Sequence, residues 1–145
     1  MTRWASPNSA KAHLNYAVML GARGHREARL KVGSRALQIA PNWPMAQVYH
    51  ADALCRLRHS EQAWPYYVRG WTLAPDNKSL VALGLQCLWE TGQFEQHRAK
   101  LRRLADAHPD TWLAYLIVDV LRHGKDQGGV APKDRPRAYD QGPKT

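Results

Sequence analysis

The stretch PNWPMAQVYHADALCRLRHSEQAWPYYVRGWTLAP, residues 41–75, begins and ends on a proline and holds two apolar-periodic segments separated by a polar break. Apolar residues that recur every three or four positions indicate amphipathic helices rather than strands. The break falls at Arg58-His59-Ser60, near the middle of the stretch. These residues therefore predict a hairpin of two helices that is bounded by prolines.

This organisation recurs along the chain at a constant interval. Each unit opens on a proline, and successive prolines lie 34 residues apart, at Pro7, Pro41, Pro75 and Pro109. The polar breaks of the neighbouring units contain Gly24 and Gly92, whose backbone freedom suits a tight turn between two helices. Arg58 holds that place in the middle unit. A period of this length is typical of proteins built from stacked helical hairpins.

The periodicity predicts six helices in three hairpins, and a seventh helix that shields the apolar side of the last hairpin. We expect these helices at about residues 9–22, 25–40, 44–57, 60–73, 78–90, 93–107 and 111–123. The array would then fill residues 9–123, with units at about 9–40, 43–74 and 77–108, after an N-terminal extension at 1–8. Residues 124–145 are rich in Pro, Gly and charge, which predicts a disordered tail.

Local signals refine the helix ends. Asn8, Asn42 and Asp76 are expected N-caps, because their side-chain oxygens can accept hydrogen bonds from the free backbone donors of a first helical turn. Pro65 would lie inside the fourth helix and remove a backbone hydrogen bond. We therefore expect that helix to start late or to bend.

The period, the proline, the turn glycine and the small residues together resemble the tetratricopeptide repeat family over residues 9 to about 122. The resemblance implies an all-α protein: a right-handed α-solenoid of three helical hairpins plus a C-terminal capping helix. It implies close helix contacts at the small residues Ala17, Ala36, Ala51, Ala63 and Gly70. Larger residues would fill the gaps between helices, namely Tyr16, Leu20, Leu54, Tyr67, Leu88, Phe94 and Leu101. The third unit departs from the pattern, with Leu85, His97 and Leu104 where small residues are usual.

In this family the first helix of each hairpin lines a concave groove. Helical spacing assigns to such a groove Lys11, Asn15, Val18, Tyr49, Asp52, Arg56, Leu83, Gln86, Trp89 and Glu90. A lining of this mixed character predicts an interaction module or scaffold that binds a peptide or partner protein. Taken singly, Tyr49, Leu83 or Trp89 could instead complete the packing between helices. The positions that grip a terminal carboxylate in chaperone-binding relatives hold no clamping side chain here, which disfavours that partner class; they are Leu14, Val18, Tyr49, Ser79 and Leu83.

The formal charge of +9 raises a second hypothesis, in which a basic outer face binds nucleic acid or another polyanion. The excess is local, because residues 1–43 carry seven Lys and Arg against Glu27 alone. Basic residues cluster on the second and sixth helices, as Arg23, Arg26, Arg29, Lys31 and Arg35, and as Arg98, Lys100, Arg102 and Arg103. A solvated helix surface explains them equally well, and interleaved aromatics for single-strand binding are missing, so the sequence disfavours nucleic acid.

Enzymatic function is disfavoured. The seven His residues are scattered, without a metal-binding or nucleophile motif, so we predict no catalytic residue, no metal site and no cofactor. Cys55 and Cys87 form no Cys-x-x-Cys pair and are expected to be reduced. The 145 residues suit one domain.

A second, shorter resemblance covers Trp4 to Tyr16, which are similar to the opening of repeat regions in polytopic membrane glycosyltransferase-like proteins. It implies that the chain is a soluble portion of a larger protein, on the exoplasmic side. Without it, the lack of a secretory signal or membrane-spanning segment favours the cytoplasm, with no membrane insertion. Exposed Trp4 or Trp112 would support weak self-association into a homo-oligomer.

Overall fold

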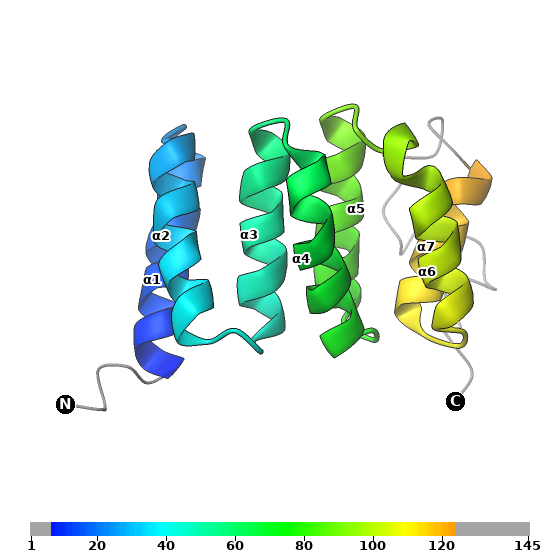
Figure 1. Cartoon of the computed structure of the whole chain (residues 1–145), viewed down its shortest axis with the longest axis horizontal. Coiled ribbons are helices and arrows are strands. Elements are labelled where there is room, and N and C mark those ends of the chain that lie inside the picture. The colour runs from blue at the N-terminus through cyan, green and yellow to red at the C-terminus, as the bar shows by residue number, and fades with distance from the viewer. Residues whose placement is uncertain (1–6, 124–145) are drawn as a thin grey trace. The chain divides into compact units, whose positions relative to one another are not determined.

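The computed structural model of the chain describes residues 7–123, and this part is helical without a strand. The helices are α1 (Pro7–Ala22), α2 (Arg26–Ile39), α3 (Pro44–Arg56), α4 (Ser60–Leu73), α5 (Lys78–Glu90), the short 3-10 helix η2 (Glu95–His97), α6 (Arg98–Ala107) and α7 (Trp112–His123) (Figure 1). The prediction of an all-α protein is confirmed. The predicted disordered tail at 124–145 lies outside the described residues, as does most of the predicted extension, although Pro7 and Asn8 already belong to α1.

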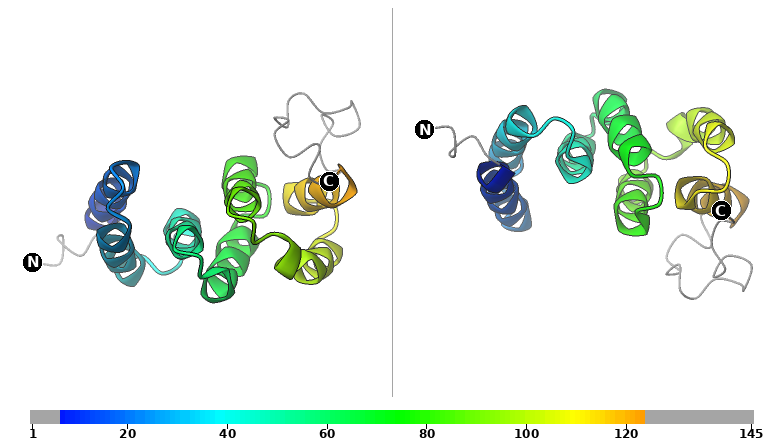
Figure 2. Two further views of the ribbon diagram at one scale, coloured as in Figure 1. Left: turned by 90° about the horizontal axis from the view of Figure 1, so that it is seen from above. Right: turned by 90° about the horizontal axis from the view of Figure 1, so that it is seen from below.

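The chain divides into two compact units. Unit 1 is Met1–Leu73 and unit 2 is Ala74–Thr145. In unit 1, α1 packs against α2, α3 packs against α4, and α2 contacts α3. Seen along the helix axes, α2 and α4 lie on the same side of unit 1 (Figure 2). In unit 2, α7 packs against both α5 and α6.

Small residues bring the helices of unit 1 close together, as the sequence predicted. Ala36, Ala51 and Ala63 have no exposed surface, and Ala17 is 3% exposed. Gly70 is the tightest of these positions, because an added Cβ would lie only 2.5 Å from Val48 Cγ2 of α3. The larger residues predicted to fill the gaps are buried too, except for Tyr16, which is 50% exposed. The prediction that Tyr16 fills a gap between helices is wrong, because half of the residue remains exposed.

Three helices end in the same turn, at positions 34 residues apart. Gly24, Arg58 and Gly92 follow α1, α3 and α5, and all three have a positive φ, of 83°, 70° and 72°. In each turn the next residue donates a backbone hydrogen bond of 2.9 Å to a leucine carbonyl five residues earlier. The pairs are His25 with Leu20, His59 with Leu54, and Gln93 with Leu88. This is the Schellman pattern, which satisfies carbonyls that a helix end leaves without a partner. Arg58 therefore adopts the backbone conformation that glycine takes in the other two turns.

The predicted N-caps of the third and fifth helices are wrong by one residue. Trp43 is the N-cap of α3, where Pro44 occupies the first helical position and suits it because its missing N–H is not needed there. Asn77 caps α5, and its side chain accepts a hydrogen bond of 3.1 Å from the Leu80 amide. Asp76 instead accepts one from the Trp112 amide, 3.1 Å away at the start of α7. Asn8 lies within α1, which begins at Pro7.

Two other helix boundaries differ from the predictions. The helix α4 starts at Ser60, so the late start expected from Pro65 is wrong, and Pro65 lies inside the helix on an exposed side. The predicted helix at 93–107 is divided into η2 and α6. His97, at the position where the pattern favours a small residue, is fully buried at the junction of the two.

The start of α7 is held by the loop that precedes α5. The Leu113 amide donates a hydrogen bond of 2.9 Å to the Pro75 carbonyl. Within its own turn, Thr111 Oγ1 accepts one from the Ala114 amide at 3.2 Å. The ammonium group of Lys78 lies 4.1 Å from the centre of the Trp112 ring, a cation–π contact. These contacts fix α7 on unit 2, where its buried side consists of Leu113, Ala114, Leu116, Ile117 and Leu121.

The turn after α3 yields a test of stability. Replacing Arg58 with Gly removes the steric cost of a side chain at positive φ. We expect Arg58→Gly to raise the free energy of unfolding by about 1 kcal/mol, measured by urea denaturation. Gly24→Ala, the opposite change in the equivalent turn of α1, should lower it by a similar amount. A destabilised Arg58→Gly variant would contradict this account.

Gly70 and Gly33 form a matched pair of helical glycines in unit 1. A methyl group at Gly70 would meet Val48 at 2.5 Å and Gln47 Cβ at 3.1 Å, whereas at Gly33 the nearest atom is Ala17 Cβ at 3.9 Å. We expect Gly70→Ala to lower the free energy of unfolding by about 1 to 3 kcal/mol through overpacking. Gly33→Ala should raise it by about 0.5 to 1 kcal/mol through helix propensity. Thermal denaturation followed by circular dichroism would separate the two.

Candidate functional site

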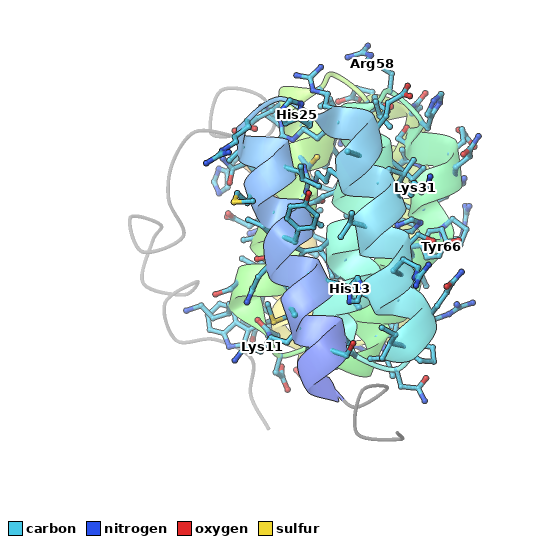
Figure 3. The ribbon with its side chains drawn as sticks, turned by 90° about the vertical axis from the view of Figure 1, so that its left-hand side faces the viewer. Lys11, His13, His25, Lys31, Arg58 and Tyr66 are labelled. Carbon is cyan, nitrogen blue, oxygen red and sulfur yellow. The ribbon has the colours of Figure 1, made fainter. Side chains whose placement is uncertain are left out.

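The described part of unit 1 contains a cleft of about 1380 Å³ with walls formed by α2 and α4. We call it the α2–α4 cleft. Its lining residues are His13, Tyr16, Glu27, Leu30, Lys31, Val32, Ser34, Arg35, Gln38, His50, Leu54, Leu57, His59, Gln62, Pro65, Tyr66 and Arg69. Figure 3 shows Lys31 and Tyr66, from its two walls, on the same side of the unit, with Lys11 of α1 on the other side.

Positive charge predominates in the lining. Lys31 and Arg35 belong to α2 and Arg69 to α4, and all three side chains are exposed. Lys31 and Arg35 are four residues apart on one helix and therefore lie on the same face. Glu27 is the single Asp or Glu of the lining, near the start of α2. The cleft can therefore attract an anionic group, most strongly at the end away from Glu27.

His50 is the buried polar residue of the lining. It is 8% exposed, and its ring meets the Tyr66 ring edge-on, with the centres 4.6 Å apart. Burial lowers the pKa of the His50 imidazole, so the ring is neutral at pH 7. Its Nδ1 has no hydrogen-bond partner within residues 7–123. Buried polar atoms normally have a hydrogen-bond partner, so a buried nitrogen without one is unusual.

The residues predicted to line a groove lie elsewhere, and none of the ten belongs to the α2–α4 cleft. In unit 1, Lys11, Asn15 and Val18 are exposed on α1, while Tyr49 and Arg56 are half-buried on α3. In unit 2, Gln86 and Glu90 are exposed and joined by a hydrogen bond of 2.7 Å. Leu83 and Trp89 are half-buried, and the Trp89 ring packs edge-on against Phe94 at 5.2 Å. Trp89 thus contributes to packing within unit 2.

Asp52 differs from the expectation of a groove-facing carboxylate, because it is 4% exposed. Its Oδ1 accepts a hydrogen bond from the Tyr67 hydroxyl of α4, and Tyr67 in turn stacks on Trp71 with ring centres 5.0 Å apart. Burial raises the pKa of the Asp52 carboxyl to about 7, against the hydrogen bond from Tyr67, which lowers it. This carboxyl therefore links α3 to α4 and is not available on the surface.

The sequence predicted the exposed face of α1 only in part, through the groove residues Lys11, Asn15 and Val18. Tyr16, Val18 and Met19 are 50%, 43% and 41% exposed, and the only other large apolar residue of the described chain exposed to this degree is Leu73. By helical spacing they share one face with exposed Lys11, Ala12 and Asn15. We call these six residues the α1 face. The sequence pattern predicted Tyr16 as a packing residue, and it gave no role to Met19.

The two predicted basic surfaces differ in character. Lys31 and Arg35 of α2 line the cleft, whereas Arg26 at the start of α2 and Arg23 in the preceding turn are exposed outside it. On α6, the Arg98 guanidinium forms an ion pair with Glu95, with Nε 2.9 Å from Oε1. That bond holds the pKa of the exposed Glu95 carboxyl below its usual value. The sixth helix is therefore partly neutralised, and the concentrated positive charge is on unit 1.

Within residues 7–123 no group of three or more His, Cys, Asp or Glu side chains is arranged to hold a metal ion. In the same range no helix combines the length and apolarity needed to cross a membrane. Comparison of the chain with family models, with curated proteins and with solved structures finds no match.

The raised pKa of Asp52 predicts a pH dependence of stability. The folded pKa of about 7 exceeds the ordinary pKa of 3.8, so the folded state binds the proton more tightly than the unfolded state. Stability from this group is greatest below pH 3.8 and is lost as the pH rises to about 7. We expect the free energy of unfolding of the wild type, relative to Asp52→Asn, to fall over this range by at most about 4 kcal/mol.

Urea denaturation at several pH values measures this difference. The comparison with Asp52→Asn is needed because His50, with its lowered pKa, acts in the opposite sense and loses stability as the pH falls through its ordinary value. Tyr67→Phe removes the hydrogen bond and should raise the pKa of Asp52 further. If the wild type and Asp52→Asn show parallel pH profiles, the carboxyl is ionised in the folded protein and the account is wrong.

Proposed function

We propose that the chain is a protein-interaction module of the tetratricopeptide type, and that the α1 face of unit 1 is part of its binding surface. The observation that carries the proposal is the concentration of exposed large apolar side chains on α1, where Tyr16, Val18 and Met19 occur within four positions. Exposed apolar residues that gather on one face mark an interaction site, whereas isolated ones need no explanation.

The chemistry of this face favours a protein partner over a polyanion. It carries one cation, Lys11, beside one amide, Asn15, and the remaining side chains are apolar or aromatic. Protein interfaces combine a core of this kind, in which Tyr and Met are enriched, with a polar rim. Lys11, Asn15 and Val18 also belong to the groove that the family resemblance implies, so the sequence pattern and the exposed surface favour the same helix.

The test is a pull-down with partners recovered from cells of the source organism and identified by mass spectrometry. Val18→Glu plus Met19→Glu places two charges on the α1 face and should abolish capture of a specific partner. Leu73→Glu is the matched control, because Leu73 is 45% exposed and lies at the end of α4. The Leu73→Glu variant should still capture the partner that the wild type captures. Retention by both variants would show that α1 does not bind, and Tyr49→Ala plus Trp89→Ala then tests the remaining groove residues.

A further inference from the structure

We propose that the α2–α4 cleft is a second binding site, and that it takes a short extended segment of a partner protein in which acidic and apolar side chains are mixed. The carboxylates of the segment lie between Lys31, Arg35 and Arg69, and its apolar side chains contact the floor. This site adjoins the α1 face, since Tyr16 belongs to both, but neither proposal requires the other.

The size of the cleft fits a peptide better than a small molecule. Its volume of about 1380 Å³ exceeds the roughly 300 to 1,000 Å³ of typical small-molecule pockets. Along α2 the lining extends from Glu27 to Gln38, a rise of about 16 Å, and along α4 it extends over a similar length from His59 to Arg69. An extended chain rises about 3.3 Å per residue, so about five residues fit between the two walls.

The three cations are available for a ligand. Within residues 7–123 none of Lys31, Arg35 and Arg69 forms an ion pair. They come from both walls, so a segment between them meets positive charge on two sides. Such complementary charge sets the orientation of a partner and the rate at which it associates. Since Glu27 lies at the opposite end of the α2 wall, the acidic end of the segment lies toward Arg35 and Arg69.

The floor supplies apolar and polar contacts. Leu30 and Leu57 are half-buried, as is Tyr66, and these side chains can receive the apolar side chains of the segment. Beside them, the Nδ1 atom of His50 lacks a hydrogen-bond partner within the described residues.

The charge of the cleft also argues against other occupants. The chain's own residues 124–145 carry five Lys and Arg against three Asp, and residues 1–6 carry Arg3 without an acidic residue, so neither complements the cleft. A nucleic-acid strand needs positive charge along its whole path and open aromatic faces for its bases. Here Glu27 interrupts the charge and the Tyr66 ring is engaged by His50.

Fluorescence anisotropy with three labelled probes tests the proposal on the full chain. The first probe is a pool of seven-residue peptides built from Asp, Glu, Leu and Phe, the second replaces the acids with Lys and Arg, and the third is a random single-stranded oligonucleotide. The acidic pool should bind more tightly than the basic pool by at least about tenfold. Its affinity should fall with rising salt, because the site is exposed. Equal binding of the two pools, or no binding of the acidic pool, would overturn the proposal.

Charge reversal within the cleft gives the matched comparison. Lys31→Glu plus Arg35→Glu should lower the affinity for the acidic pool by at least about tenfold and raise the affinity for the basic pool. Arg23→Glu plus Arg26→Glu changes the net charge equally but lies outside the lining, and it should leave both affinities within about twofold. If both double variants lost affinity for the acidic pool equally, net charge alone would explain the effect, and the proposed site would be wrong.

Milder substitutions and an NMR measurement on His50 complete the test. If the Glu variants unfold, as judged by circular dichroism, Lys31→Gln plus Arg35→Gln replaces them with the same expectation of weakened binding. In the wild type, the NMR signals of the His50 ring should shift on addition of the acidic pool, and unchanged signals would contradict the location. Tighter binding of the oligonucleotide than of the acidic pool, lost on reversal at Lys31 and Arg35, would assign the cleft to nucleic acid instead.

Discussion

The reversal of the backbone after α1, α3 and α5 is the constraint on which the other features depend. In each turn a residue at positive φ allows the following amide to reach back to a leucine carbonyl, and that leucine is itself buried. In unit 1, where α1 packs against α2 and α3 against α4, the turn thereby fixes which side chains of the two helices face each other. Small residues such as Ala51 and Gly70 must then recur at set distances from it, because only they permit the close approach that follows.

Much of the fold could be predicted because its signals are local and periodic. The 34-residue spacing placed every α-helix to within a few residues, and the glycines marked two of the three reversals. The third could be placed only by the interval, since Arg58 carries no turn preference of its own. A predicted helix cap was wrong where a residue distant in the sequence forms a hydrogen bond with its side chain. Asp76 was a reasonable cap for its own helix, but its carboxylate is taken by Trp112, which comes 36 residues later.

The surfaces could be predicted only in part. Helical spacing correctly predicted exposure for Lys11, Asn15 and Val18, since one helix decides it. Helical spacing wrongly predicted exposure for Asp52. This carboxyl is buried and accepts a hydrogen bond from the Tyr67 hydroxyl, which belongs to α4. The cleft shows the same limit, since Lys31 and Arg35 were recognisable as a basic run but Arg69 and His50 come from other helices. Sequence periodicity shows which face of a single helix is exposed. It does not show which faces of several helices together form a cavity.

The anchoring of α7 has a practical consequence for dissecting the molecule. Its first two amides donate hydrogen bonds to Asp76 and Pro75, which precede α5, so the loop before α5 is joined to the start of α7. A truncation before Thr111 would strip Leu113 and Ile117 from their neighbours and leave the Asp76 carboxylate without the Trp112 amide. Any shortened version of this half intended for expression therefore has to retain both the loop at residues 74–77 and the helix through His123.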